Sequence, residues 1–431
     1  MGWGTLVVQT RPRLSKMAEP HSWVSILLGL CLVCTYGTPV ADMLAHPPPL
    51  PLVIDYQGTD ITAEDEEAII LALVQRDRVR RVRFNLPVLK LQKLIAVLDE
   101  EYPILEYIIF VEPPEGKSTV LTLPKTLQTP HLRHLAIGCS IPIRFQLLTT
   151  AVGLVTLYLA LYNPSTYFQP SVIIQSLSLM PQLENLLINF HFAVPNRDVE
   201  RQLMRTPIMT HATLPNLRSF AFRAVSAYSE AVLSRITASH LENFHIGYLP
   251  QLTFSVPQFV QFMAITQHFG FQRAELYFSS ERVYVSANPP EANCNTPRDA
   301  FSINVDCWHL DWQVSSMAQI INALSQILSA EHLTLTHQLH DRSSEEHNEV
   351  DRTEWRKLLR SFSNVKALRI DDGLVKELSR SLLLEDGEHP LEILPELQEL
   401  TYPGRGNVDD AFTPFIDARQ NAGRPVTLIK S

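Results

Sequence analysis

The sequence predicts an α/β fold in which one short unit, a strand followed by a helix, recurs along most of the chain. Apolar residues repeat at positions i, i+3 and i+5 in the pattern L-x-x-L-x-L, and amphipathic segments separate these triads. Successive triads lie about 22 to 35 residues apart, a period typical of leucine-rich repeats. We therefore predict an irregular leucine-rich-repeat solenoid, with short parallel strands on its concave side and helices on its convex side.

Each triad is expected to form a short strand with alternate side chains in the core, because side chains along a strand point to opposite faces. The clear triads are Leu105/Ile108/Phe110, Leu132/Leu135/Ile137, Leu154/Leu157/Leu159, Leu183/Leu186/Ile188, Leu217/Phe220/Phe222, Leu241/Phe244/Ile246, Val365/Leu368/Ile370 and Leu397/Leu400/Tyr402. Weaker copies are expected at Leu276/Phe278, Trp308/Leu310 and Leu333/Leu335.

The segments between triads predict helices. Residues 63–75 carry an acidic first turn behind Thr62, a residue type that favours the N-cap. Helical periodicity also marks residues 170–180, 256–269, 315–328 and 353–362. Two polar interruptions, Asn288 to Asp299 and His340 to Arg352, predict exposed loops. The asparagine that usually follows the last leucine of each repeat is absent, so we expect irregular turns and uneven curvature.

Composition and charge exclude several functional classes. Apolar residues make up 45% of the chain and charged residues 19%, which is ordinary globular usage. The net charge of −9 argues against a nucleic-acid or anionic-membrane surface, because either would require clustered Lys and Arg. Five cysteines show no zinc-site spacing, and the C-x-x-C of Cys31 and Cys34 has no second ligand pair.

No constellation of residues proposes an enzyme. The sequence contains no nucleotide-binding loop and no G-x-S-x-G motif. His337 and His340 lack a third ligand nearby for a metal ion. In "DCWHLDW", alternation predicts a strand with Cys307 and His309 on one face and Trp308 and Leu310 packed on the other. We therefore expect no catalytic, cofactor-binding or metal-ligating residue.

An apolar run, Trp23 to Cys34, allows two interpretations of the N-terminus. Basic residues precede it and small residues follow it, as in a secretory signal peptide, although it is too short to span a bilayer. Cleavage near Gly37 or Ala41 would leave three cysteines, an odd number for an oxidising compartment. No asparagine lies in a glycosylation acceptor site.

The alternative rests on a resemblance. The stretch "LVCTYGTPVADML" (Leu32 to Leu44), followed by "PPLPLVIDYQG" (Pro48 to Gly58), resembles the join between F-box and leucine-rich-repeat regions in basidiomycete F-box proteins. Residues 1–31 do not match the F-box that precedes this join in the family. The resemblance implies a substrate receptor that docks a Skp-type adaptor and presents targets to a cullin–RING ubiquitin ligase. Docking is expected only if an F-box is present upstream.

Two functional hypotheses follow. The first is a non-enzymatic protein-interaction module, the substrate-recognition part of an F-box ubiquitin ligase receptor, in the cytoplasm or nucleus. The second is a secreted or surface leucine-rich-repeat protein with a signal peptide. Under either, residues 1–45 form an atypical N-terminal segment and residues 46–431 form the solenoid. We expect a target protein as the partner, with no nucleic acid, no membrane and no cofactor.

The binding face is predicted from the triads. Residues at i+2, i+4 and i+6 from each first leucine should point out of the concave side of a solenoid. The candidate protein-binding residues are Tyr158, Asn185, Asn189, Arg223, Asn243, His245, Tyr277, His309, Arg369 and Asp371, with His134, Thr156 and Thr334 beside them. Tyr158, Arg223 and Tyr277 are the expected anchors, because Tyr and Arg are common hot-spot residues.

Overall fold

A computed structural model describes the chain at residues 31–45, 50–58, 61–112, 124, 127–138, 150–164, 167–191, 208–266, 271–288, 301–325, 327–338, 351–384, 388–403 and 411–430. Most of the two predicted loops, at Asn288 to Asp299 and His340 to Arg352, lies outside the described residues. The same holds for residues 1–30 of the N-terminal segment and for His340.

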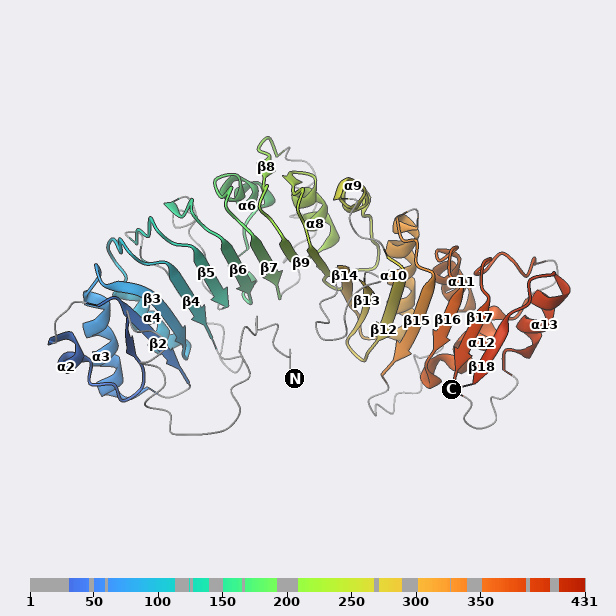
Figure 1. The fold of residues 1–431 in the computed structure, drawn as a ribbon, viewed down its shortest axis with the longest axis horizontal. Coiled ribbons are helices and arrows are strands. Elements are labelled where there is room, and N and C mark those ends of the chain that lie inside the picture. The colour runs from blue at the N-terminus through green and yellow to red at the C-terminus, as the bar shows by residue number, and fades with distance from the viewer. Residues whose placement is uncertain are drawn as a thin grey trace.

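The described residues form one 16-stranded sheet that curves along the length of the molecule (Figure 1). In spatial order its strands are β1 (Leu32–Cys34), β2 (Leu52–Gln57), β3 (Val79–Asn85), β4 (Tyr107–Val111), β5 (His134–Gly138), β6 (Thr156–Leu161), β7 (Asn185–Phe190), β9 (Ser219–Ala224), β11 (Asn243–Tyr248), β14 (Phe301–Asp306), β13 (Arg282–Asn288), β12 (Arg273–Phe278), β15 (His332–His337), β16 (Ala367–Ile370), β17 (Glu399–Tyr402) and β18 (Thr427–Lys430). A separate pair joins β8 (Ala212–Thr213) to β10 (Ile236–Thr237).

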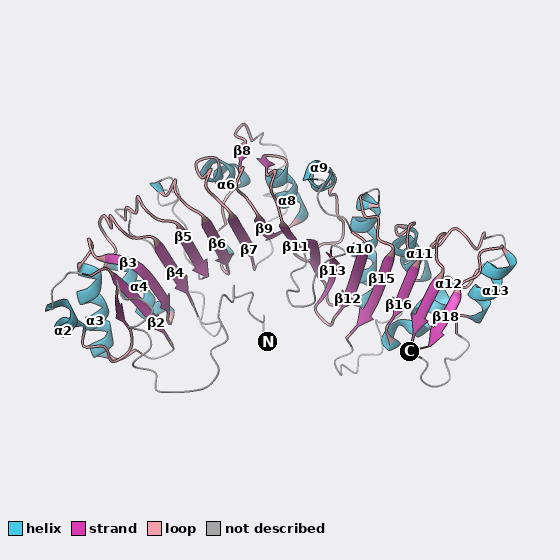
Figure 2. Cartoon of the chain, in the orientation of Figure 1, coloured by secondary structure: helices cyan, strands magenta, loops and turns pink. Residues whose placement is uncertain are grey.

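Helices connect the strands, and α6, α8 and α9 lie along the outer side of the arc (Figure 2). The helices are α2 (Val40–Ala45), α3 (Ala63–Val74), α4 (Val88–Ala96), α6 (Pro170–Leu177), α8 (Ser226–Leu233), α9 (Pro257–Thr266), α10 (Leu310–Leu324), α11 (Arg352–Arg360), α12 (Val375–Leu382) and α13 (Thr413–Asn421), with a 3₁₀ turn at η2 (Asp372–Leu374). Within the described ranges, none of them is both long and apolar enough to cross a bilayer. The predicted α/β class with a long, mostly parallel sheet is confirmed.

The triads form the core between sheet and helices. Leu105, Ile108 and Phe110 are completely buried, and the other clear triads are buried in the same way. Adjacent units are joined by stacked rings, with Phe220 5.5 Å from Phe244 and Phe244 6.1 Å from Phe301 between centroids. Each unit therefore buries its apolar edge against the next, and the core runs without a break along the sheet.

An antiparallel insertion interrupts the parallel order. Strand β13 pairs antiparallel with both β12 and β14, whereas β14 pairs parallel with β11 and β12 pairs parallel with β15. After β11 the chain leaves two strand positions open and forms β12, and β13 and β14 then fill the two open positions. The predicted weak copy at Leu276/Phe278 is confirmed as β12. The copy predicted at Trp308/Leu310 is wrong, because the strand ends at Asp306 and α10 begins at Leu310.

The N-terminal motif forms the first edge of the sheet. Strand β1 pairs parallel with β2, so the sheet begins at Leu32, ahead of residue 46. Gly37 follows in a turn with a φ of 68°, a conformation that favours glycine. Its amide donates to Oδ1 of Asp65 at 3.1 Å, and Asp65 also completes the capping box of α3 with Thr62. The predicted N-cap at Thr62 is confirmed.

Candidate functional site

Among the described residues, helices pack on one face of the sheet and leave the other face uncovered by helices (Figure 1). Phe222 stacks on Tyr228 of α8, and Phe244 lies 5.5 Å from Phe262 of α9, so these side chains point toward the helices. Alternate residues on the same strands therefore point the opposite way. We call this side the helix-free face. Its central positions are Tyr158, Leu187, Ala221, His245 and Ser302 in one register row, and Ala160, Asn189, Arg223, Gly247, Asn304, Tyr284 and Tyr277 in the next.

Most of the predicted binding residues lie on this face. Their side chains alternate with buried triad residues, and none of them is itself fully buried. They are Tyr158 on β6, Asn185 and Asn189 on β7, Arg223 on β9, Asn243 and His245 on β11, Tyr277 on β12 and Arg369 on β16. The same holds for His134, Thr156 and Thr334. Their binding role stays a prediction.

Two placements differ from the prediction. His309 is not a strand residue but the N-cap of α10, where its ring lies 5.2 Å from that of Trp312. The alternation in "DCWHLDW" predicted a strand with Trp308 and Leu310 packed on one face, yet Trp308 is 67% exposed whereas Leu310 is buried as the first residue of α10. Asp371 lies one residue beyond β16, and its carboxylate accepts a hydrogen bond from the amide of Asp372 at 2.9 Å, capping η2.

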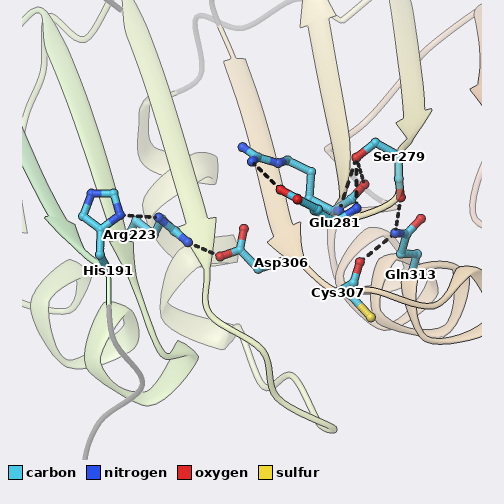
Figure 3. A network of polar contacts seen from close by, with 8 residues as sticks. His191, Arg223, Ser279, Glu281, Asp306, Cys307 and Gln313 are labelled. Carbon is cyan, nitrogen blue, oxygen red and sulfur yellow. Dashed lines mark hydrogen bonds and ion pairs between the residues drawn. The ribbon is translucent and has the colours of Figure 1, made fainter. Parts of the chain in front are cut away.

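Arg223 is the centre of a polar cluster on the helix-free face. One guanidinium nitrogen, Nη1, lies 3.3 Å from Nδ1 of His191, while Nη2 donates to Asp306 (Figure 3). The same Nη1 lies 3.3 Å from Oδ1 of Asn189. The Arg223 and Asp306 side chains are only 11% and 14% exposed. We call Asn189, His191, Arg223 and Asp306 the Arg223 cluster. It joins strands β7, β9 and β14 across β11.

Gly247 allows this span. It lies between Arg223 and Asn304 in the register of β9, β11 and β14. A Cβ atom at this position would lie 2.7 Å from Oδ1 of Asn304 and 2.9 Å from Cγ of Arg223, closer than real contacts. The absence of a side chain on β11 therefore lets the arginine lie over the strand and reach Asp306.

A second polar group adjoins it. His245 bonds through Nδ1 to the hydroxyl of Ser302, and its Nε2 lies 3.1 Å from the amide nitrogen of Asn304. Ser302 and Asn304 are each 4% exposed although they lie on the face without helices. The helix-free face is thus closed to solvent at Ser302 and Asn304 on β14, next to the antiparallel insertion.

The histidine of the Arg223 cluster is neutral at pH 7. Burial lowers the pKa of His191 from its ordinary value of 6.5, the positive charge of Arg223 lowers it further, and the result is about 4. Because a guanidinium can only donate, Nδ1 of His191 accepts and its proton lies on Nε2. The ring also stacks on Tyr162, with centroids 4.2 Å apart and planes 13° from parallel.

The charged and ring groups of the Arg223 cluster are already paired with one another. Its cation is neutralised by Asp306, and its imidazole already accepts from Arg223. Cys307 next to it is 6% exposed, and burial raises the pKa of its thiol, which disfavours the reactive thiolate. Across the described ranges, no three His, Cys, Asp or Glu side chains are placed to hold a metal ion.

Gln313 holds the insertion in place beside the cluster. Its Nε2 donates to the carbonyl oxygens of Ser279 and Cys307, each at 2.7 Å (Figure 3). The side chain is almost completely buried, at 1% exposed. The turn between β12 and β13 is therefore tied to the start of α10, which fixes the position of Asp306 relative to Arg223.

The sequence prediction missed part of this face. Strands β13 and β14 supply Tyr284, Ser302, Asn304 and Asp306, but their segments carry no i, i+3, i+5 triad. A period-two pattern in "RVYVSAN" was the available signal. Strand β3 was also missed, although Val79, Val82 and Phe84 have the triad spacing and are completely buried.

The chain resembles a solved leucine-rich-repeat structure. The leucine-rich repeat-containing protein LegL7 from Legionella pneumophila is similar at 12% sequence identity and a TM-score of 0.28, with 92% of this chain and 99% of that chain covered. No family model matches the chain, and no curated protein matches it.

Proposed function

We propose that the chain is an irregular leucine-rich-repeat solenoid that acts as a non-enzymatic protein-interaction module, with the helix-free face as its binding surface. Repetition of one strand–helix unit along a continuous core supports the solenoid. Such an array presents its strands on an extended curved surface, which suits a protein partner better than a small molecule.

The observation that carries the proposal is the chemistry of the helix-free face. Tyr158, Asn185, Asn243 and Tyr277 present aromatic and amide groups, and none of these side chains is buried in the core. Tyr supplies a large contact area with one polar end, and amides adapt their hydrogen bonds to a partner. The Arg223 cluster gives this surface a rigid centre, because its groups are held before a partner arrives.

We further propose that the module is the substrate-recognition part of an F-box ubiquitin ligase receptor of the cytoplasm or nucleus. The resemblance of "LVCTYGTPVADML" to the F-box join supports this. The motif also has a local structural role: Tyr36 packs edge-on against Tyr56 at 5.2 Å, and Gly37 bonds to Asp65. A Skp-type adaptor is a partner only where an F-box precedes Leu32, and the ligase chemistry belongs to other subunits.

The alternative is a secreted or surface repeat protein. Cleavage near Gly37 or Ala41 would remove β1, whose Cys34 is completely buried, and would leave β2 as an open sheet edge. This consequence favours the intracellular proposal. Expression with a tag at each end separates the two: a chain that loses its N-terminal tag and about 40 residues and appears in the medium would end the receptor hypothesis.

The binding face is tested by paired variants. Tyr158→Ala, Tyr277→Ala and Arg369→Ala together alter the helix-free face, whereas Leu89→Ala, Ile265→Ala and Lys357→Ala alter exposed positions on α4, α9 and α11. Quantitative affinity purification should show partners lost from the face variant and kept by the helix variant, with unchanged thermal unfolding in both. The reverse outcome would place the binding surface on the helices.

A further inference from the structure

The N-terminal part of the helix-free face carries an exposed pair of positive charges in a chain whose net charge is −9. Arg81 and Arg83 lie on β3 and are both exposed. The arginines at the start of the same segment are engaged elsewhere: Nε of Arg78 donates to the carbonyl oxygen of Leu50 at 3.1 Å, and Nε of Arg80 donates to Glu106 at 3.0 Å.

The guanidinium of Arg81 is positioned by aromatic contacts. It lies 4.4 Å from the centroid of the Tyr107 ring, a cation–π geometry, and Tyr107 in turn lies 5.1 Å from His134. Arg81, Tyr107 and His134 are neighbours in register on β3, β4 and β5. In the part of the chain that the structure describes, Arg81 has no hydrogen-bond acceptor, so its donors face outward.

Arg83 extends the positive region two residues further along β3. Its Nη1 lies 4.0 Å from Oδ2 of Asp55, the limit of an ion pair, while Asp55 accepts a closer bond from Gln57 at 2.8 Å. Both groups of the Arg83–Asp55 contact are open to water, so it is worth little. Arg83 therefore keeps most of its donors for an incoming anion.

A half-buried apolar row continues from Arg83 across the sheet. In register with it lie Ile109 on β4, Ala136 on β5, Tyr158 on β6 and Leu187 on β7. Ala136 carries only a methyl group between the larger Ile109 and Tyr158. The helix-free face thus changes from cationic at β3 to apolar at β5 to β7 over a short distance.

We propose that strands β3 to β7 bind an extended acidic–hydrophobic peptide segment of a partner protein, with its carboxylates on Arg81 and Arg83 and an apolar side chain on Ala136 and Tyr158. The inference rests on the proposed function and names the chemistry of the partner. From β3 to β6 there are three strand spacings of about 4.8 Å, and an extended peptide advances about 3.4 Å per residue. The acidic and apolar residues of the segment are therefore about four positions apart.

Charge complementarity favours a peptide over a nucleic acid. Two arginines match two carboxylates as bidentate partners. A phosphate backbone would need a longer basic track, and it would meet a chain with nine excess negative charges.

The test uses fluorescein-labelled heptapeptides with two aspartates four positions from a leucine, in both sequence orders, and the same peptides with lysine in place of aspartate. Fluorescence polarisation compares the wild-type chain with Arg81→Gln/Arg83→Gln. The matched control is Arg273→Gln/Arg424→Gln, which removes the same charge from exposed arginines outside β3 to β7. Arg81→Lys/Arg83→Lys keeps the charge but loses the planar fork.

We expect the acidic peptide in one order to bind, with affinity lowered at least tenfold in Arg81→Gln/Arg83→Gln, lowered less in the lysine variant and changed less than twofold in the control. Raising the salt concentration should weaken binding. Equal binding of the lysine peptide, equal loss in the control, or tighter Arg81-dependent binding of a uridine decamer would overturn the inference. If no peptide binds while the face variant above still loses its partner, the proposed function stands and this inference fails.

Discussion

Replacing Gly247 with alanine tests the packing that holds the Arg223 cluster. A glycine inside a strand ordinarily costs about 0.5–1 kcal/mol relative to alanine, so propensity alone predicts that Gly247→Ala stabilises the chain. The structure predicts the opposite sign. The new methyl group would lie 2.7 Å from Oδ1 of Asn304 and 2.9 Å from Cγ of Arg223, and overpacking of this kind costs about 1–3 kcal/mol. The expected net result is a destabilisation of about 1 kcal/mol.

The free energy of unfolding is measured by urea titration of the wild-type and Gly247→Ala chains. Because Cγ of Arg223 is one of the atoms in the way, the cost of Gly247→Ala should be smaller in an Arg223→Ala background, and the double-mutant cycle gives that difference. A Gly247→Ala chain as stable as wild type, or an equal cost in both backgrounds, would refute the reasoning that the glycine makes room for the arginine.

Three further predictions concern stability. Leu186→Ala should cost about 2–5 kcal/mol in urea unfolding because Leu186 is 2% exposed, whereas Leu187→Ala, on the opposite face of the same strand, should cost under about 1 kcal/mol; equal costs would contradict the strand assignment. Burial raises the pKa of Asp65, but hydrogen bonds from Gly37 and Thr62 outweigh burial and hold that pKa below 3.8. The stabilisation from the Asp65 carboxylate is therefore present above pH 3.8 and is lost as the pH falls through the pKa of the folded chain. Asp65→Asn should remove this acid dependence and cost about 1 kcal/mol at pH 7, as measured by urea unfolding. The pKa of His191 is lowered from 6.5 to about 4, so as the pH is lowered the unfolded chain binds this proton before the folded chain does. The free energy of unfolding should therefore decrease as the pH falls from about 6.5 to about 4. If a His191→Gln chain loses stability with pH as steeply as wild type over this range, His191 is not the group responsible.

The recurring unit was predictable because its signal is local. Leu186 and Ile188 alternate with Leu187, and Leu183 three residues earlier closes the turn before the strand, so the buried positions follow from the triad spacing. The same reasoning placed Tyr158 and His245 on the face opposite the helices. It would also have found β3, since Val79, Val82 and Phe84 obey the same spacing.

The antiparallel insertion was not predictable from this pattern. Strand β14 alternates Phe301, Ile303 and Val305 with polar residues, which indicates a strand, but alternation does not say which strands lie beside it. Its neighbour on one side, β11, lies far back in the sequence, and no local rule gives that pairing. The assignment of His309 to a strand failed because it extended the alternation of β14 past Asp306, whereas the buried Leu310, Gln313 and Val314 have the spacing of a helix.

The environment of Arg223 depends on residues that are far apart in the sequence. Asp306 lies 83 residues away, and the contact requires a glycine at position 247 on the intervening strand. From the sequence, Arg223 is predicted only as a binding anchor that points out of the strand face. Because its side chain is 11% exposed and paired with Asp306, substitution would leave a largely buried carboxylate without its cation.

Site-specific photocrosslinking tests most directly whether the helix-free face binds the partner. A benzoylphenylalanine in place of Tyr158 puts a reactive ring on that face at β6, and one in place of Leu89 puts it on α4, where the natural side chain is 76% exposed. After irradiation of the chain with its co-purified partner, we predict a crosslinked species from position 158 and none from position 89. Crosslinking from position 89 alone would contradict the central claim.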